Sequence, residues 1–161
     1  MVRTLIAGFG NELRGDDALG VEVIHRLEAA GGLGGGVELL EVGTGGIRLA
    51  QELLTPCDRL IVVDCISRGG APGTVYVLEV ESVAAVGEVD LHLAVPARAL
   101  SLAQALGALP ARTFLVGCEP EQVDELTTEL SPAVRGALEA VIGHVRRLAG
   151  PGVSQAADTD G

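Results

Sequence analysis

Apolar and polar residues follow one another along the chain in blocks that predict strands separated by helices. Short apolar runs, several of them rich in β-branched residues, predict five strands, at residues 2–9, 37–42, 59–66, 74–80 and 112–118. Segments with apolar residues at three- and four-residue spacing predict helices, at residues 16–30, 47–54, 96–106 and 133–149. We therefore expect an α/β fold, a three-layer α/β/α sandwich with a five-stranded, mostly parallel sheet.

The ends of these segments carry residues that begin or stop helices. Ser131 and Pro132 place an N-cap residue and a first-turn proline before the last predicted helix. The glycine-rich residues 31–36 end the first helix, and residues 81–95 are expected to form a loop. The pattern fits a single domain over residues 1–149, followed by a small polar tail, residues 150–161, that is expected to be disordered.

The composition narrows the range of partners. The chain has 11 basic and 22 acidic residues, and this net charge of −11 repels nucleic-acid phosphates. It has no tryptophan for base stacking, and its apolar runs are shorter than the about 18–20 residues that span a bilayer. The first apolar run also lacks a signal-peptide cleavage pattern. We expect a cytoplasmic monomer that neither binds nucleic acid nor inserts into a membrane.

The cysteines agree with a reducing compartment. Cys57, Cys65 and Cys118 are odd in number and form no C-x-x-C motif, so they do not indicate a disulfide scaffold. Cys65 and Cys118 stand at the ends of apolar runs, where a cysteine usually packs as a small apolar residue. Because side chains alternate along a strand, we expect Cys65 to point away from the face of its neighbour Asp64.

Polar residues gather where the predicted strands end. Residues 8–17 follow the first strand, residues 43–46 follow the second, and Asp64 ends the third. Ligands of parallel α/β sheets bind at the carboxyl ends of the strands, so we expect these segments to meet. Asp16 and Asp17 exceed what one helix cap requires, and a carboxylate at the end of a buried strand is costly unless it is hydrogen-bonded or used.

The three histidines differ in their setting. His25 lies on the polar face of the first predicted helix, and His144 lies near the negative end of the last helix. His92 lies in an expected loop, where packing gives no reason for it. Together with Asp17 and Asp64 it makes a carboxylate–carboxylate–imidazole set that suits zinc, nickel, manganese or iron. The spacing matches no short metal motif, so these residues alone do not single out a metal site.

The segment GFGNELRGDDALG, residues 8–20, resembles the signature of the hydrogenase maturation endopeptidases. That signature is roughly G-x-G-N, four residues, two acidic residues and a nearby glycine. The similarity covers about residues 2–148 and continues through residues 43–46, 60–64, 71–74, the loop around His92, and residues 114–120. The first motif is fairly specific, and its combination with Asp64 and His92 in order is more so.

The resemblance implies a function. The family clips a short C-terminal peptide from the large-subunit precursor of nickel-iron hydrogenase after nickel has been inserted there. The implied metal-contacting and catalytic residues are Asp17, Asp64 and His92, with nickel presented by the precursor and no nucleotide cofactor. Substrate backbone is expected at four residues that include flexible glycines, namely Asn11, Gly43, Thr44 and Gly45. Asp16 is either a general base or a helix cap, and we favour the cap.

Three other functional hypotheses compete with the maturation endopeptidase. The first is a dinucleotide-binding oxidoreductase: Gly8-x-Gly10 after a strand is part of its fingerprint, but Leu13 stands where the third glycine belongs. A metal-dependent chaperone that binds the precursor without cutting it would use the same residues as the endopeptidase. A serine or cysteine hydrolase finds little support, because the chain has no G-x-S-x-G motif and Cys65 is expected on the opposite face from Asp64.

Overall fold

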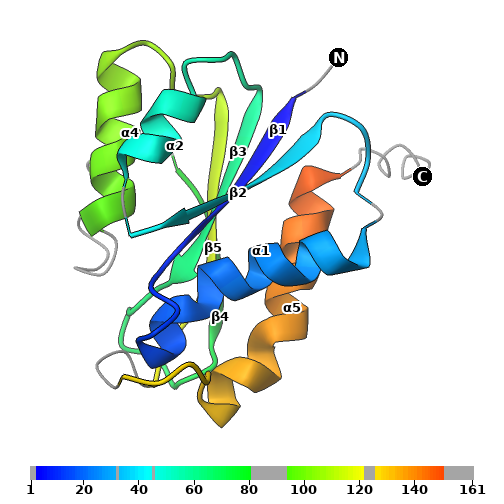
Figure 1. The fold of residues 1–161 in the computed structure, drawn as a ribbon, viewed down its shortest axis with the longest axis vertical. Coiled ribbons are helices and arrows are strands. Elements are labelled where there is room, and N and C mark those ends of the chain that lie inside the picture. Colours follow the sequence, from blue (N-terminus) through cyan, green and yellow to red (C-terminus); the bar gives the residue numbers. More distant parts are fainter. Residues whose placement is uncertain (1–2, 32, 45, 81–93, 122–125, 151–161) are drawn as a thin grey trace.

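A five-stranded sheet forms the middle of the molecule (Figure 1). The computed structural model describes residues 3–31, 33–44, 46–80, 94–121 and 126–150. The strands are β1 (Thr4–Phe9), β2 (Val37–Gly43), β3 (Arg59–Cys65), β4 (Val75–Glu79) and β5 (Arg112–Cys118). Their order is β2-β1-β3-β5-β4, with β4 antiparallel to β5 and the other neighbours parallel. The predicted mostly parallel sheet is confirmed.

Helices cover both faces of this sheet. One face packs against α1 (Leu19–Ala30) and α5 (Pro132–Ala149), and the other packs against α2 (Ile47–Glu52) and α4 (Ala94–Ala105) (Figure 1). The strands supply both cores because their side chains alternate in direction: Leu60 and Val62 face α2 and α4, whereas Ile61 and Val63 face α1 and α5. The predicted three-layer sandwich is confirmed.

Two helix starts show how well local signals predict boundaries. Ser131 caps α5 as expected, because its hydroxyl accepts a hydrogen bond from the backbone N–H of Val134. The first helix begins differently: a single 3₁₀ turn, Gly15–Ala18, precedes α1, which starts at Leu19. α4 starts two residues earlier than predicted and keeps Pro96 in its first turn. Residues 81–93 of the predicted loop and the tail beyond Gly150 lie outside the described residues.

Candidate functional site

Asp64 lies at the carboxyl edge of the sheet. It is the second-last residue of the central strand β3, is only 4% exposed, and stands in register with Gly117 of β5. Its Oδ1 accepts a hydrogen bond of 2.8 Å from the backbone N–H of Cys65. A buried carboxylate is tolerated when hydrogen bonds compensate its lost hydration, and this bond supplies part of that compensation.

Asp17 reaches the same edge from the 3₁₀ turn after β1. Its Oδ2 accepts the backbone N–H of Asn11 at 3.1 Å, and its Oδ1 accepts the thiol of Cys65 at 3.6 Å. The loop between β1 and this turn folds tightly, since Gly10 has a φ of 134° and a Cβ there would collide with the carbonyl oxygen of Asp17. Glycine at position 10 therefore lets the Asp17 turn close over the end of β1.

These side chains form one cluster. One carboxylate oxygen each of Asp17 and Asp64 and the Sγ of Cys65 all lie within 4.8 Å of one another. Two metal–ligand bonds of about 2.0–2.3 Å separate two ligands by at most about 4.6 Å, so small side-chain rotations would bring all three onto one ion. The expectation that Asp17 and Asp64 meet is confirmed, and the donor set fits a divalent transition metal.

The face predicted for Cys65 does not keep its sulfur away from the site. Alternation predicts the face opposite to that of Asp64, and the sulfur nevertheless lies within the same cluster. The physical reason is position, because Cys65 is the last residue of β3 and the 3₁₀ turn that carries Asp17 packs against this strand. At the end of a strand, side chains from both faces can reach one group that lies beyond the sheet edge.

The structure describes some of the predicted site residues and leaves out others. His92 and Gly45 lie outside the described residues. Asn11 belongs to the cluster through its backbone, and its side-chain Oδ1 accepts the N–H of Leu13 at 2.9 Å. The carbonyl of Gly43 accepts the N–H of Gly10 at 2.8 Å, which ties the end of β2 to the first loop. Asn11 and Gly43 therefore come together at the predicted edge of the sheet.

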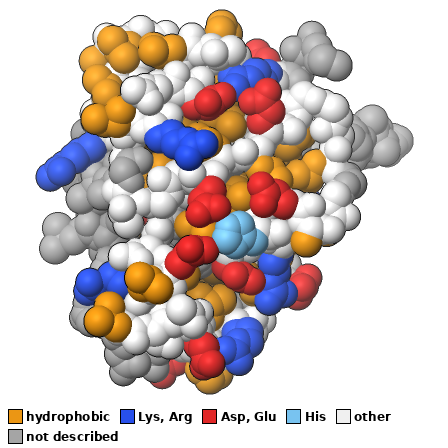
Figure 2. Space-filling model, in the orientation of Figure 1, with side chains coloured by type: hydrophobic (Ala, Val, Ile, Leu, Met, Phe, Trp, Pro, Cys, Tyr) orange, Lys and Arg blue, Asp and Glu red, His pale blue; other side chains and the backbone are white. Residues whose placement is uncertain are grey.

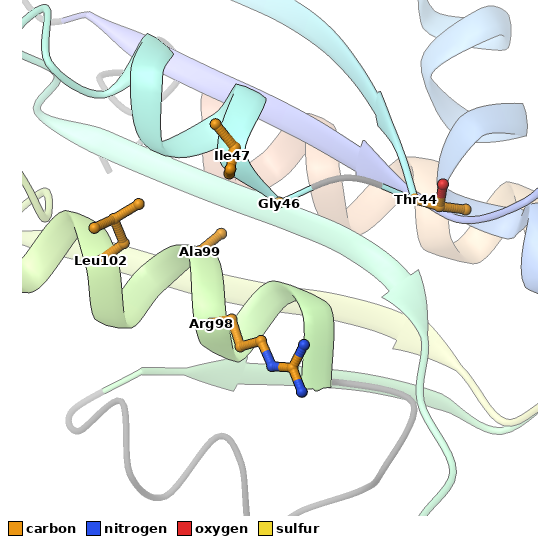
Figure 3. Close-up of a pocket in the computed structure, with 6 residues that line it drawn as sticks. All are labelled: Thr44, Gly46, Ile47, Arg98, Ala99 and Leu102. Atoms are coloured by element: carbon orange, nitrogen blue, oxygen red, sulfur yellow. The ribbon is translucent and has the colours of Figure 1, made fainter.

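A groove opens between α2 and α4 beside this edge (Figure 3). It encloses about 270 Å³ and is lined by Thr44, Gly46, Ile47, Arg98, Ala99 and Leu102. Ile47 and Leu102 are 65% and 42% exposed, so apolar surface stays open there. Figure 3 shows Arg98 extending toward the N-terminal end of α4. The groove starts at the loop after β2, where substrate contacts were expected.

Asp16 has a different role from the helix cap that we favoured. Neither the 3₁₀ turn nor α1 has a side-chain cap hydrogen bond. The Asp16 carboxylate is fully buried and accepts bonds from the backbone N–H of Ser131, the Ser131 hydroxyl and the backbone N–H of Glu121, at 2.7, 2.8 and 2.7 Å. It therefore fastens the connection between β5 and α5 onto the first loop.

A third buried carboxylate, Glu119, was not predicted from the sequence. It accepts the Tyr76 hydroxyl at 2.6 Å and the backbone N–H groups of Arg68 and Gly70 at 2.9 and 3.2 Å. Burial opposes its ionisation, but these hydrogen bonds outweigh burial and hold the pKa of Glu119 below its ordinary value. Glu119 directly follows β5. Because it binds the N–H groups of Arg68 and Gly70, it holds the loop after β3 at the sheet edge that carries Asp64.

His25 is bound more firmly than a solvated histidine. Its Nε2 lies 2.8 Å from Glu41 of β2, and its Nδ1 lies 3.8 Å from Glu12 of the first loop. The hydrogen bond with Glu41 raises the pKa of His25. Figure 2 shows a histidine surrounded by acidic side chains on one face of the molecule. The imidazole lies between acidic side chains of two elements, β2 and the first loop.

Solved structures share this fold. The hydrogenase maturating endopeptidase HybD from Escherichia coli superposes with a TM-score of 0.80 at 34% identity, covering 89% of this chain and 90% of that chain. The [NiFe] hydrogenase maturation protease HybD from Thermococcus kodakarensis gives a TM-score of 0.78 at 28% identity, covering 92% and 100%. The three-layer sandwich is thus a fold shared with hydrogenase maturation endopeptidases.

Sequence comparison gives the family. The family model for hydrogenase maturation proteases matches residues 21–147. The hydrogenase 2 maturation protease of Escherichia coli (strain K12) is 34% identical over 151 residues, which cover 90% of this chain and 92% of that protein. HupD, a hydrogenase expression/formation protein of Rhizobium leguminosarum bv. viciae, is 35% identical over 99% of this chain and 80% of its own length. The chain belongs to the hydrogenase maturation protease family and is a peptidase, hence a hydrolase.

The structure also explains the glycines that suggested a dinucleotide. A Cβ on Gly8 would collide with the backbone of Gly20 in α1, and a Cβ on Gly10 would collide with Asp17. Close packing of the first loop and helix therefore accounts for the G-x-G pattern.

Among the described helices, none is long and apolar enough to cross a membrane.

Proposed function

We propose that this chain is the endopeptidase that removes the C-terminal peptide from the nickel-loaded large-subunit precursor of a [NiFe] hydrogenase. Asp17, Asp64 and His92 complete the coordination of the nickel that the precursor presents. The observation that carries the proposal is the approach of the Asp17 and Asp64 carboxylates at the carboxyl edge of the sheet, within 4.8 Å. His92 enters through the family resemblance, since it lies outside the described residues.

The chain's own groups hold both carboxylates ready for this role. Asp17 is oriented by the N–H of Asn11, and Asp64 is oriented by the N–H of the next residue. Such prior orientation reduces the reorganisation that binding requires. Nickel held between precursor thiolates and these oxygens would polarise the nearby scissile carbonyl. Precursor without nickel would lack the ion that joins it to Asp17 and Asp64, so the site would select loaded precursor.

The groove between α2 and α4 is the proposed binding site for the precursor's polypeptide chain. Asn11, Gly43, Thr44 and Gly45 are proposed to contact the precursor's backbone. Gly43 has a φ of 72° and a Cβ there would meet no atom within 4 Å, so open space surrounds this position. Thr44 leads directly into the apolar groove between α2 and α4. An extended peptide could pass from the two carboxylates into this groove.

A processing assay tests the proposal. Purified protein is mixed with large-subunit precursor, nickel-loaded in one sample and nickel-free in the other, and the C-terminus is read by mass spectrometry. We expect loss of a C-terminal peptide from the loaded precursor only, and no loss with the His92→Ala variant. His144→Ala is the matched control, because its imidazole contacts Arg147 on α5. It should cut at the wild-type rate.

The same assay distinguishes the endopeptidase from a non-proteolytic chaperone. That protein would bind the loaded precursor and leave it uncut, whereas the endopeptidase releases a peptide. Cleavage of nickel-free precursor at an equal rate would remove nickel recognition from the proposal. Wild-type activity of His92→Ala would remove His92 from the site.

A further inference from the structure

We propose that the Cys65 thiolate is a protein ligand of the metal in this site, beside Asp17 and Asp64. The inference rests on the proposed metal-recognising function but adds a sulfur donor that the family resemblance does not supply. The resemblance implies two carboxylates and an imidazole only. A thiolate at this position changes which metals the site prefers.

The first argument is geometric. The Sγ of Cys65 lies 3.6 Å from Oδ1 of Asp17, and it lies within 4.8 Å of an Asp64 carboxylate oxygen. Cys65 is 1% exposed and Asp64 is 4% exposed, so both donors are held in place by the packing around them. Donor atoms this close to one another need only small side-chain rotations to reach one metal ion.

The second argument is a comparison with the other two cysteines. Cys118 is Cα partner to Cys65 across the β3–β5 ladder, yet its thiol lies against the carbonyl oxygen of Glu119 at 3.7 Å. Burial, with Asp16 and Glu119 nearby, raises the pKa of the Cys118 thiol to about 11. The Cys57 thiol donates to the carbonyl of Arg59 at 3.0 Å. Cys57 and Cys118 therefore contact backbone carbonyls, whereas Cys65 contacts a carboxylate of the site.

The third argument concerns the chemistry of the donor set. Thiolate ligands favour nickel, zinc and cobalt over magnesium, calcium and manganese, which carboxylates and water suit better. When the sulfur binds the ion, the thiol releases its proton to solvent. A mixed oxygen and sulfur site would make the recognition of a soft divalent ion more selective. This selectivity matches the proposed discrimination between loaded and empty precursor.

Cobalt spectroscopy on the isolated protein tests the inference without any precursor. Co²⁺ is titrated into the wild-type chain, and the near-ultraviolet sulfur-to-metal charge-transfer band is recorded with the visible d–d bands. We expect the charge-transfer band in wild type and in Cys57→Ser, and its loss in Cys65→Ser and Cys65→Ala. Loss of a ligand should weaken Co²⁺ binding by at least about tenfold. Circular dichroism verifies that each variant is folded.

Measurements on the wild-type protein test the inference even if a Cys65 variant fails to fold. X-ray absorption of the nickel-loaded wild-type chain should show sulfur among the nearest neighbours of the ion, and Asp17→Asn should weaken nickel binding. Visible bands without a charge-transfer band would overturn the inference, and so would a band that persists in Cys65→Ala or no binding at saturating Co²⁺. Cleavage of loaded precursor by a wild-type protein without the band would leave the proposed function standing. A charge-transfer band without cleavage of loaded precursor would support the Cys65 ligand and contradict the proposed function.

Discussion

The Asp16 carboxylate and Ser131 are joined by two hydrogen bonds, one from the serine N–H and one from its hydroxyl, across 115 positions of sequence. The same hydroxyl oxygen accepts the N–H of Val134 and so caps α5. One serine therefore begins the last helix and anchors it to the turn that carries Asp17. The position of that turn depends on a contact made at the far end of the chain.

Ser131→Ala should destabilise the protein more than loss of an ordinary cap. The substitution removes the cap, typically about 1 kcal/mol, and it also removes a bond to a buried carboxylate, worth about 1.5–3 kcal/mol. We expect a loss of about 2–4 kcal/mol in the free energy of unfolding, measured by urea denaturation. Thr74→Ala, at an exposed turn hydroxyl that donates to Ala71, is the control and should cost less than about 1 kcal/mol. Equal losses in both variants would contradict the role assigned to Ser131.

Glu41→Gln should lower the pKa of His25. The hydrogen bond to Glu41 raises the pKa of His25 above 6.5, so this pair stabilises the fold below about pH 6.5. That contribution is lost as the pH rises through the raised pKa, where the imidazole becomes neutral. NMR titration of the imidazole protons should show the lower pKa in Glu41→Gln, and added salt should reduce the shift because the pair is partly exposed.

Glu38→Gln provides the control for this titration. Glu38 lies on the same strand, β2, but pairs with Arg3 at 2.8 Å. The pKa of His25 should be the same as in wild type. An unchanged pKa in Glu41→Gln would show that this ion pair does not form in solution.

The sequence predicts the elements and part of the site, because both depend on local patterns and connectivity. Periodicity located all five strands, and the parallel order then placed Asp17 and Asp64 at one edge. The bonds of Asp16 and Glu119 were not predictable in this way. Asp16 meets Ser131 only because α5 packs beside α1, and Glu119 meets Tyr76 only through the antiparallel pairing of β4 with β5.

Cys65 shows a limit of the alternation rule itself. The rule assigns a face of the sheet, and Cys65 does lie on the opposite face from Asp64 within the strand pattern. It does not describe what lies beyond the end of the strand. There the turn with Asp17 meets both residues, and its position is set by tertiary packing.

Gly20→Ala should disrupt the packing that holds this turn. A Cβ at position 20 would collide with the backbone carbonyl oxygens of Phe9 and Val63, so α1 could not remain at its present distance from β1 and β3. Backbone atoms cannot rotate away as a side chain can, and we expect a loss of about 3 kcal/mol or more. Thermal unfolding followed by circular dichroism measures it.

Gly136→Ala is the matched control for that helix substitution. In α5 a Cβ at position 136 meets nothing within 4 Å, so only helix propensity changes. The variant should be more stable by about 0.5–1 kcal/mol. Similar effects at both positions would show that α1 does not pack as closely as described.

Asp64→Asn should abolish processing of nickel-loaded precursor and leave the fold intact. The amide keeps the size of the side chain but removes the negative charge and half of its capacity to bind a metal. Loss of the proposed metal ligand should lower the rate by at least about 100-fold, the upper end of the effects seen for outer-shell partners. The rate is measured by mass spectrometry of the precursor's C-terminus, at precursor concentrations that saturate the wild-type protein.

Asp58→Asn makes the same chemical change at the other end of the same strand. Asp58 directly precedes β3 and accepts the N–H of Arg3 at 2.8 Å, far from the carboxyl edge. The amide oxygen of asparagine can still accept this N–H, so stability should change only slightly and the processing rate should stay within about twofold of wild type. If both variants lost activity equally, fold disruption would explain the effect. If Asp64→Asn retained wild-type activity, the carboxylate would not be part of the reacting site.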